Sequence, residues 1–438
     1  MKHNLQPLLW MRENREQLDV SVRQHLIDKL QFLRKVPCFI QRFVAKWFYH
    51  FVRVPVILEF EQSVSAQSQS VVSELRMQKV AVEQQFTHFP GCATRLTLRK
   101  LNSIIKHNGI GKIYLNRKIT ALLDHATPTV HSPRLWNNEA TGKDIGIAIV
   151  DTGVAPHTDL TQPTNRIVAF KDFVHHETEP YDDNGHGTHC AGDAAGNGNA
   201  SNGTYRGPAY EANIIGVKVM DRRGSGQLSD LIAGVDWCIL NRNQYNIRVL
   251  SLSLGSPASG KVDNDPLARI VRQAWANGLV VVAAAGNTGP ESGTISSPGV
   301  VPEILTVGAS TDQNTVDRSD DEVANFSSRG PTPEGITKPD VVAPGTDIAS
   351  LRVKGSFLDK MNGENTIDDN YMNLSGTSMA TPIVAGIAAQ LLQKDTTLTP
   401  NDVKTAITTT AESLGNEPNA EGNGLVDAAA AYDFIMKR

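Results

Sequence analysis

The chain has 438 residues, of which 40% are hydrophobic and 20% are charged. This composition is that of a globular protein and excludes a disordered, collagen-like or coiled-coil chain. Its 42 basic and 46 acidic side chains give a net charge of −4, so the molecule as a whole offers no basic field to a nucleic-acid backbone. We therefore expect no nucleic-acid partner.

The four cysteines, Cys38, Cys92, Cys190 and Cys238, form no CxxC pair. We expect free thiols rather than a disulfide framework or a zinc site. The first 20 residues are interrupted by charges and hold no apolar stretch typical of a secretory signal. No run approaches the roughly 18 apolar residues of a membrane span. The sequence therefore predicts a cytoplasmic protein without a transmembrane segment.

Residues 1–53 are predicted to form a basic helical segment, because ten Lys and Arg stand there against four Asp and Glu. Aromatic residues are interleaved with these charges at Trp47, Phe48, Tyr49 and Phe51. The pattern favours an amphipathic helix that packs on the rest of the chain. A membrane-surface or partner-binding role is the alternative.

Residues 54–117 predict a small, separate α+β unit. The pattern is strand, helix, strand, helix and strand, which is close to a split β-α-β unit; the ranges are 54–60, 65–78, 86–96, 98–107 and 110–115. Residues 118–142 contain Pro128, Pro133 and several polar residues. This composition indicates an exposed connector and a candidate cleavage site.

From residue 143 to residue 438 the pattern alternates between strands and amphipathic helices. The strands are apolar throughout, which is typical of parallel strands buried on both faces; they span 145–150, 214–219, 249–252, 279–285 and 304–307. The prediction is an α/β domain with a doubly wound parallel sheet. In such sheets functional residues gather at the carboxyl ends of the strands.

Three chemically complementary side chains stand at element boundaries, each within two residues of a glycine. Asp151 ends the first strand, His186 enters a helix of small residues, and Ser378 precedes another helix. Serine needs an adjacent base to act as a nucleophile, and the imidazole needs a carboxylate that orients it. A helix N-terminus at Ser378 favours the negative charge that develops on attack. Asn287, which follows a strand, could supply a second oxyanion donor.

These segments resemble those of the subtilase family, the subtilisin-like serine proteases, over residues of about 120–438. The matching segments are Asp151-Thr-Gly, Gly185-His-Gly-Thr-His189, Ser253-Leu-Gly255, Ala284-Ala-Gly-Asn287 and Gly376-Thr-Ser-Met-Ala380. The resemblance implies a serine endopeptidase that works through an acyl-enzyme. Asp151 would orient His186, His186 would be the general base, and Ser378 would attack. Asn287 and the Ser378 N–H would hold the oxyanion.

The resemblance also implies a substrate-binding strand and a pocket for the side chain before the cut. Ser253, Leu254 and Gly255 would pair with an extended peptide, although these residues could also form a purely structural strand end. Ala284 and Gly286 would line the other wall, with residues 295–299 near the base. The small residues leave room for a sizeable side chain, so we expect broad specificity with an apolar preference.

Three further residues carry weaker predictions. Cys190 stands where the proteinase K branch has a thiol beneath the histidine, so a mercurial bound there would inhibit; a small buried residue is the alternative. Asp159 and the loop 196–203 resemble parts of a structural calcium site, although such loops are often simple turns. No cofactor is expected for the chemistry itself. His189 is better explained as a structural histidine than as a metal ligand.

Two further features concern regulation: one departs from the family pattern, and the other resembles it. The stretch 352–371 is longer than in the family and suggests a lid or an autolysis-prone loop. By pattern alone, residues 54–117 resemble a subtilase prodomain, which would assist maturation and whose tail would occupy the cleft as an inhibitor. Cleavage is then expected between about 115 and 130. A permanent packing domain is the alternative, and an inactive binding protein of the same fold is disfavoured because no triad member is missing.

Overall fold

The computed structural model describes residues 49–50, 52–61, 66–78, 80–86, 89–107, 109–116, 118–121 and 128–437, apart from residues 259 and 313–315, together with single positions between residues 14 and 26. The chain divides into two compact units, residues 1–117 and residues 118–438. Each unit is described by itself. Most of the predicted helical segment 1–53 lies outside the described residues.

From residue 53 to residue 116, the described residues of the first unit form a four-stranded sheet and two helices. The sheet has the order β2-β3-β1-β4, and β1 runs antiparallel to both of its neighbours. Thr97 caps the second helix by accepting a hydrogen bond from the Lys100 N–H at 3.3 Å. The elements are β1 (Arg53–Phe60), α4 (Ala66–Met77), β2 (Val82–Gln85), β3 (Gly91–Thr97), α5 (Leu98–Ile104) and β4 (Ile110–Leu115).

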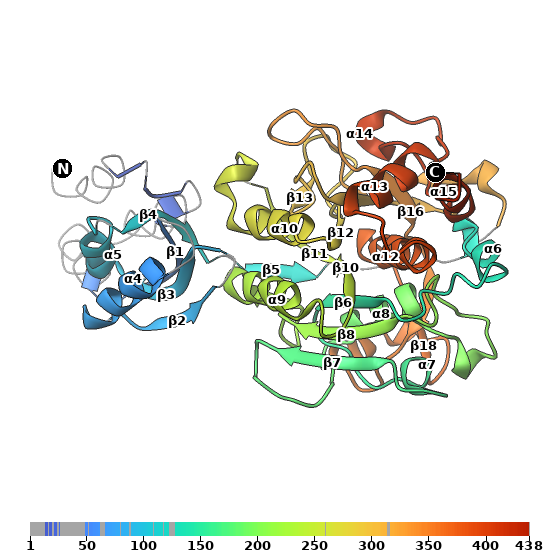
Figure 1. Ribbon diagram of the computed structural model, residues 1–438, viewed down its shortest axis with the longest axis horizontal. Helices are drawn as coiled ribbons and strands as arrows, with labels where there is room; N and C mark the ends of the chain where they lie inside the picture. The colour runs from blue at the N-terminus through green and yellow to red at the C-terminus, as the bar shows by residue number, and fades with distance from the viewer. Residues whose placement is uncertain are drawn as a thin grey trace. The chain divides into compact units, whose positions relative to one another are not determined.

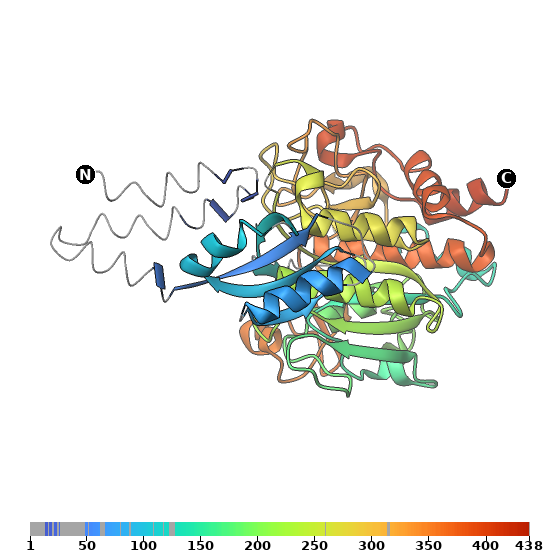
Figure 2. The same cartoon turned by 60° about the vertical axis from the view of Figure 1, so that its left-hand side comes forward.

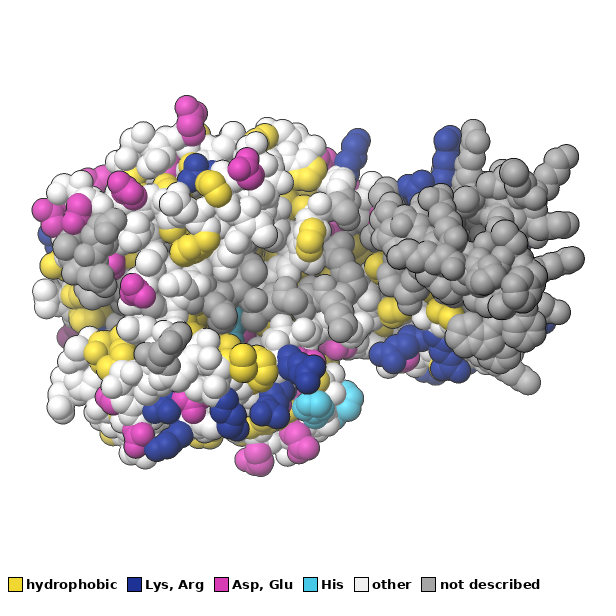
Figure 3. Space-filling view, turned by 180° about the vertical axis from the view of Figure 1, so that it is seen from behind, with side chains coloured by type: hydrophobic (Ala, Val, Ile, Leu, Met, Phe, Trp, Pro, Cys, Tyr) yellow, Lys and Arg dark blue, Asp and Glu magenta, His cyan; other side chains and the backbone are white. Residues whose placement is uncertain are grey.

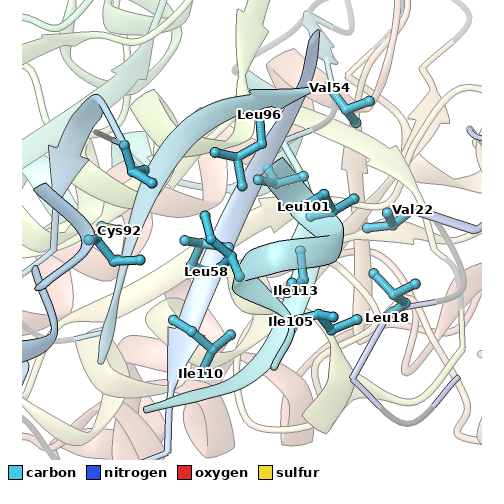
Figure 4. Close-up of a cluster of buried hydrophobic side chains, with 14 of the residues drawn as sticks. Leu18, Val22, Val54, Leu58, Cys92, Leu96, Leu101, Ile105, Ile110 and Ile113 are labelled. Atoms are coloured by element: carbon cyan, nitrogen blue, oxygen red, sulfur yellow. The ribbon is translucent and has the colours of Figure 1, made fainter. Parts of the chain in front are cut away.

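A buried apolar cluster holds this unit together (Figure 4). It joins Leu58 of β1 and Ile113 of β4 to three residues from the preceding segment, namely Leu18, Val22 and Leu26, all fully buried. Val22 and Leu26 are helical and four residues apart, which is the spacing of one helix face, whereas Leu18 forms a parallel bridge with Ile113 of β4. That arrangement is the one expected if the N-terminal segment packs on this unit.

The second unit is built on an eight-stranded, mainly parallel sheet (Figure 1). The predicted doubly wound α/β class is confirmed, and the five predicted apolar strands correspond to β6, β8, β10, β12 and β14. The strand order is β15-β14-β12-β10-β6-β8-β7, with β16 beside β14. The strands are β6 (Gly146–Asp151), β7 (Ile167–Asp172), β8 (Asn213–Lys218), β10 (Ile247–Leu252), β12 (Val280–Ala284), β14 (Leu305–Thr311), β15 (Glu322–Val323) and β16 (Val341–Pro344).

Helices flank this sheet in two packed pairs. The first is α8 (His186–Ala195) with α12 (Thr377–Lys394), and the second is α9 (Leu228–Asn241) with α10 (Pro266–Ala276). Figure 2 shows the long α12 from a second direction. The shorter helices are α6 (Pro133–Trp136), α7 (Thr158–Thr161), α11 (Phe357–Met361), α13 (Pro400–Thr409), α14 (Pro418–Glu421) and α15 (Ala428–Ile435). None of the helices in the described part of the chain has both the length and the apolar character needed to cross a bilayer.

Two small sheets complete this unit. One has the order β13-β11-β5-β9, made of β5 (Lys118–Ala121), β9 (Ser225–Gln227), β11 (Leu254–Pro257) and β13 (Ser296–Ser297). The other pairs β17 (Ile348–Leu351) with β18 (Tyr371–Leu374). Charged side chains of both signs lie on the face of this unit drawn in Figure 3, in keeping with the small net charge.

The predicted connector 118–142 is more structured than the sequence suggested. It contains β5, paired on both sides, and α6, whose Leu135 is buried. Ser132 is also fully buried and donates a hydrogen bond of 2.7 Å to Gln390 of α12. The proline and polar residues of 118–142 predicted an exposed linker. In the structure, strand pairing at β5 and burial at α6 fix parts of this stretch instead.

Candidate active site

A buried carboxylate and imidazole meet where β6 ends and α8 begins. His186 Nδ1 lies 2.7 Å from Asp151 Oδ1, and both side chains are excluded from solvent. The Thr152 N–H donates to the same Oδ1 at 2.7 Å and fixes the carboxylate. We assign the ring proton to Nδ1, because a carboxylate accepts it there. Nε2 then serves as the basic nitrogen.

Asp182 holds the loop that delivers His186. Its fully buried carboxylate accepts hydrogen bonds from the N–H groups of Asn184, Gly185 and Thr188 and from the hydroxyls of Thr152 and Thr188, at 2.7–3.1 Å. Burial raises the pKa of Asp182, while these donors act in the opposite direction. Sequence reasoning missed this residue, although an acidic pair directly before the histidine loop was a visible signal.

Lys218 connects the two loops that carry Asp151 and His186. It ends β8 fully buried, and its Nζ donates to the Thr152 carbonyl at 2.6 Å and to Asp183 Oδ1 at 2.7 Å. The Met220 carbonyl accepts a third bond at 3.0 Å. A lysine at the end of an otherwise apolar strand was the signal for this site, because a buried ammonium needs such partners.

Ser378 is the second residue of α12. Cys190 contacts both Ser378 and the pair formed by Asp151 and His186. The Ser378 Oγ donates to the Ser253 carbonyl at 3.2 Å, and Ser253 Oγ donates back to the Ser378 carbonyl at 2.5 Å. The Cys190 Sγ lies 3.6 Å from the Ser378 carbonyl oxygen, 3.8 and 3.9 Å from the ring nitrogens of His186, and 3.9 Å from Asp151 Oδ2. The structure thus brings the three predicted catalytic residues together with the predicted thiol.

Burial keeps the Cys190 thiol protonated. Burial first, and then the charge of Asp151, raise its pKa well above that of an ordinary thiol. Cys92 and Cys238 are likewise buried free thiols among the described residues. Cys190 is therefore poised to contact the imidazole without acting as a nucleophile.

Asn287 is oriented by the first residue of α12. Its Oδ1 accepts from the Thr377 N–H at 2.9 Å and from the Thr377 hydroxyl at 3.0 Å. Because Thr377 occupies the oxygen, the amide's Nδ2 is the end left to donate to a substrate oxygen. The dipole at the start of α12 favours negative charge at the same place. Thr377 was not predicted, since its role depends on a contact 90 residues away in sequence.

The two predicted walls of the substrate pocket converge on Ser296. A Cβ built at Gly255 would lie 2.9 Å from Ser296 Cβ, and one built at Gly286 would lie 2.6 Å from Ser296 Oγ. Leu254 and Ala284 are buried on either side, in β11 and β12. The predicted segment 295–299 thus lies between the two walls. Glycine is required at positions 255 and 286, because a larger residue at either would collide with Ser296.

Asp159, the predicted metal ligand, is surrounded by donors. Its carboxylate accepts from the N–H groups of Gly198 and Ala200 at 3.1 and 2.8 Å, and from the Tyr371 hydroxyl at 2.7 Å. Burial first, and then the Asp159 hydrogen bond, raise the pKa of Tyr371, so the hydroxyl keeps its proton. A calcium ion needs oxygen lone pairs directed at it. The residues around this carboxylate therefore do not fit the ion.

The side chain of Arg206 packs against the same loop, residues 196–203. Arg206 Nε donates to the Asn197 carbonyl at 3.0 Å. Glycines at 198 and 203 pack against this side chain, since a Cβ at either would come within 3.0–3.2 Å of it. The Arg206 guanidinium also lies over the rings of Trp136 and Tyr210, at 5.9 and 5.0 Å from their centroids, so the loop carbonyl and two aromatic rings hold this cation.

Two further predicted features have clear positions. His189 is fully buried, with Nδ1 at 3.1 Å from Asp193 and Nε2 at 3.2 Å from the Met372 carbonyl, which is a structural arrangement. In the long stretch 352–371, the N–H groups of Phe357 and Leu358 donate to the carbonyls of Asp183 and Asn184. This stretch therefore packs against the loop before His186.

A carboxylate, an imidazole and a serine at a helix N-terminus, carried on a parallel α/β sheet, define a serine hydrolase. The chain belongs to the subtilase family, whose family model matches residues 142–424. It is accordingly a subtilisin-like serine endopeptidase.

Individual relatives cover nearly the whole chain. Serine protease AprX of Bacillus subtilis (strain 168) is 43% identical over 433 residues, which are 95% of this chain and 96% of that protein. Subtilisin E of the same strain is 31% identical over 382 residues, 86% of this chain and 89% of that protein. A thermostable alkaline protease of Halalkalibacterium halodurans is 33% identical over 380 residues, 86% and 91% of the two chains.

Proposed function

We propose that this endopeptidase cuts peptide bonds through an acyl-enzyme on Ser378. His186 Nε2 takes the hydroxyl proton as Oγ adds to the peptide carbonyl, and then gives it to the departing amine. Asp151 stabilises the imidazolium that forms between these steps. Asn287 Nδ2 and the Ser378 N–H hold the oxyanion. The observation that carries this proposal is the buried 2.7 Å contact between His186 Nδ1 and Asp151 Oδ1.

The second part of the proposal is that the N-terminal segment restrains the enzyme. β5 lies between β11 and β9, antiparallel to both, so it takes the place of an extended peptide beside Ser253. A peptide substrate and β5 cannot pair with these two strands at once. The uncut chain should therefore hydrolyse substrates more slowly than the processed enzyme.

The third part is broad specificity with an apolar preference before the cut. The walls at Gly255 and Gly286 are backbone and small side chains, which select by shape and hydrophobicity rather than by charge.

The cytoplasmic location predicted from the sequence belongs to the same proposal. Cell fractionation, followed by detection of the chain with an antibody, tests that location.

The test is hydrolysis of denatured casein by the wild-type chain and by Ser378→Ala. We expect many peptides from the wild type, mostly ending in apolar residues by mass spectrometry, and none from the variant. A product set without apolar enrichment would remove the specificity part alone. Equal hydrolysis by the two chains would remove the acyl-enzyme proposal.

A further inference from the structure

Three of the buried oxygen atoms that have no hydrogen-bond partner among the described residues lie at one corner of the large sheet. Two are the carboxylate oxygens of Asp321, a residue that is only 6% exposed. The third is the hydroxyl oxygen of Ser310 in β14. A buried polar atom without a partner carries a desolvation cost, and a buried charge carries a larger one. These atoms therefore point to a ligand that binds at this corner.

The pairing of β14 with β15 places these oxygens on one face of the sheet. The two strands are antiparallel, and Thr311 is opposite Glu322. The next step of the same register puts Asp312 opposite Asp321. Ser310 stands two residues before Asp312, and residues two apart on a strand share a face. Side chains of opposite residues also share a face, so all three side chains extend to the same side.

The two opposite carboxylates repel each other. Like charges directly opposite in an antiparallel pair destabilise a sheet. Burial first, and then the charge of Asp312, raise the pKa of Asp321 to about 6. The exposed carboxylates of Asp317 and Asp320 act in the same direction. At pH 7 the buried carboxylate is still mostly ionised, so it needs a positive charge beside it.

Arg318 counters this repulsion only in part, because its guanidinium is held by other groups. Its Nη1 donates to Asp427 at 2.9 Å and lies 3.3 Å from Glu412. Its Nη2 donates to two backbone carbonyls at 3.0 and 3.3 Å. Its Nε, like the Asp321 oxygens, has no hydrogen-bond partner among the described residues, so the guanidinium and the Asp321 carboxylate are not paired. One cation is thus shared with two other carboxylates.

We propose that a calcium ion binds at the ends of β14 and β15, held by the carboxylates of Asp312 and Asp321, with the Ser310 hydroxyl as a neutral oxygen on the same face. Calcium takes about six to eight oxygen ligands in a flexible geometry, and water can complete the set. The ion neutralises the repulsion between the carboxylates and gives the buried oxygens a partner. Asp159 differs, because N–H and O–H donors already surround its carboxylate.

The test is isothermal titration calorimetry of calcium into Ser378→Ala, a chain that cannot digest itself. We expect one site that Asp321→Asn weakens at least about 10-fold, because calcium affinity depends on the number of charged ligands. Asp320→Asn is the matched control, since it removes the same charge from an exposed neighbour. Its affinity should stay within about 3-fold of the parent, because solvent screens an exposed charge.

The melting temperature gives a second readout whose sign depends on the ion. With a chelator present, Asp321→Asn should melt at the same temperature as the parent or higher, because it removes a buried charge opposite Asp312. In millimolar calcium the order should reverse. Asp312→Asn should show the same reversal, and it keeps the test open if Asp321→Asn does not fold.

Three results would overturn the proposal. The first is that the parent binds no calcium at millimolar concentration. The second is calcium binding that both aspartate substitutions leave unchanged, which would place the ion elsewhere. The third is a substituted chain that is more stable than the parent in chelator and in calcium alike, which would mean that no ion compensates the pair.

Discussion

Asp151 and Asp159 are two fully buried carboxylates in neighbouring parts of one chain, and their partners give them opposite roles. Asp151 faces an imidazole, whose charge can change during a reaction. Asp159 accepts hydrogen bonds from two backbone N–H groups and a tyrosine hydroxyl, none of which changes charge near neutral pH. The nearest imidazole, that of His157, lies 3.9 Å from the carboxylate and accepts the Asp159 N–H at Nδ1. Burial lowers the pKa of His157, so this ring stays neutral near pH 7. A buried carboxylate thus takes its function from the groups directed at it. The comparison predicts that Asp151 governs rate and Asp159 governs stability.

The largest expected effect is on turnover. Asp151→Asn should lower kcat about 10⁴-fold, by analogy with carboxylate substitutions in other serine-protease triads. Its melting temperature should stay close to that of the wild type. The measurement is hydrolysis of a chromogenic peptide after each variant has passed over immobilised wild-type enzyme, so that an uncut N-terminal segment does not add to the loss.

Asp159→Asn is the control for that variant. It should keep kcat within a few-fold while it melts at a lower temperature, because an amide cannot accept all of the donors around it. A large loss of kcat in a folded Asp159→Asn chain would break the comparison.

The next effect concerns the oxyanion. Asn287→Ala should lower kcat about 100- to 1,000-fold with little change in KM, by analogy with oxyanion-hole substitutions in subtilisin. The physical reason is that the amide stabilises charge that exists only in the transition state. Steady-state kinetics measure the two constants separately. A rise in KM at constant kcat would instead assign Asn287 to ground-state binding.

A stability effect of intermediate size is expected at Tyr371. Tyr371→Phe removes one buried hydrogen bond to a carboxylate and should cost about 1.5–3 kcal/mol of unfolding free energy. Chemical denaturation of Ser378→Ala with and without the second change measures this cost without self-digestion. An unchanged unfolding free energy would mean that the hydroxyl contributes nothing at Asp159.

The Cys190 thiol, which contacts His186 and Asp151, gives a further prediction for the catalytic carboxylate of this comparison. Cys190→Ser should change kcat by only a few-fold, yet it should abolish inhibition by a mercurial, because the metal on sulfur would displace His186. Iodoacetamide should not label Cys190 in the folded protein at pH 7 to 8, since burial and the charge of Asp151 raise the pKa of the thiol well above that range. Inhibition that persists in Cys190→Ser would place the mercurial elsewhere.

The last prediction is that calcium has no effect on the melting temperature through the Asp159 loop. Removing calcium with a chelator should leave the melting temperature of Ser378→Ala unaltered when Asp321→Asn is also present, because the Gly198 and Ala200 N–H groups and the Tyr371 hydroxyl already donate to the Asp159 carboxylate. Differential scanning fluorimetry with added calcium provides the reverse test. A clear rise in melting temperature that Asp159→Asn removes would restore a metal ion to this position.

The sequence was most informative where the signal is local. Asp151, His186 and Ser378 each stand within two residues of a glycine at a strand end or helix start, so they can be found without knowing the fold. The apolar strands likewise predicted a parallel sheet because burial on both faces leaves a continuous pattern.

What the sequence could not give depends on contacts between distant residues. Tyr371 reaches Asp159 across 212 positions, and this contact turned an expected metal ligand into an acceptor of protein donors. Asp182 and Lys218 hold the catalytic loops through groups that only the folded chain brings near. The pairing of β5 was hidden for the same reason, since register between strands is set by the partner and not by the strand alone.

The most direct test of the central claim is to map the fluorophosphonate adduct on the processed enzyme by mass spectrometry of its peptides. The account predicts a single adduct on Ser378 in the wild type, the same adduct in Asp159→Asn, and none in Ser378→Ala. An adduct on a different residue, or undiminished labelling of Ser378→Ala, would contradict the assignment of Ser378 as the nucleophile activated by His186 and Asp151.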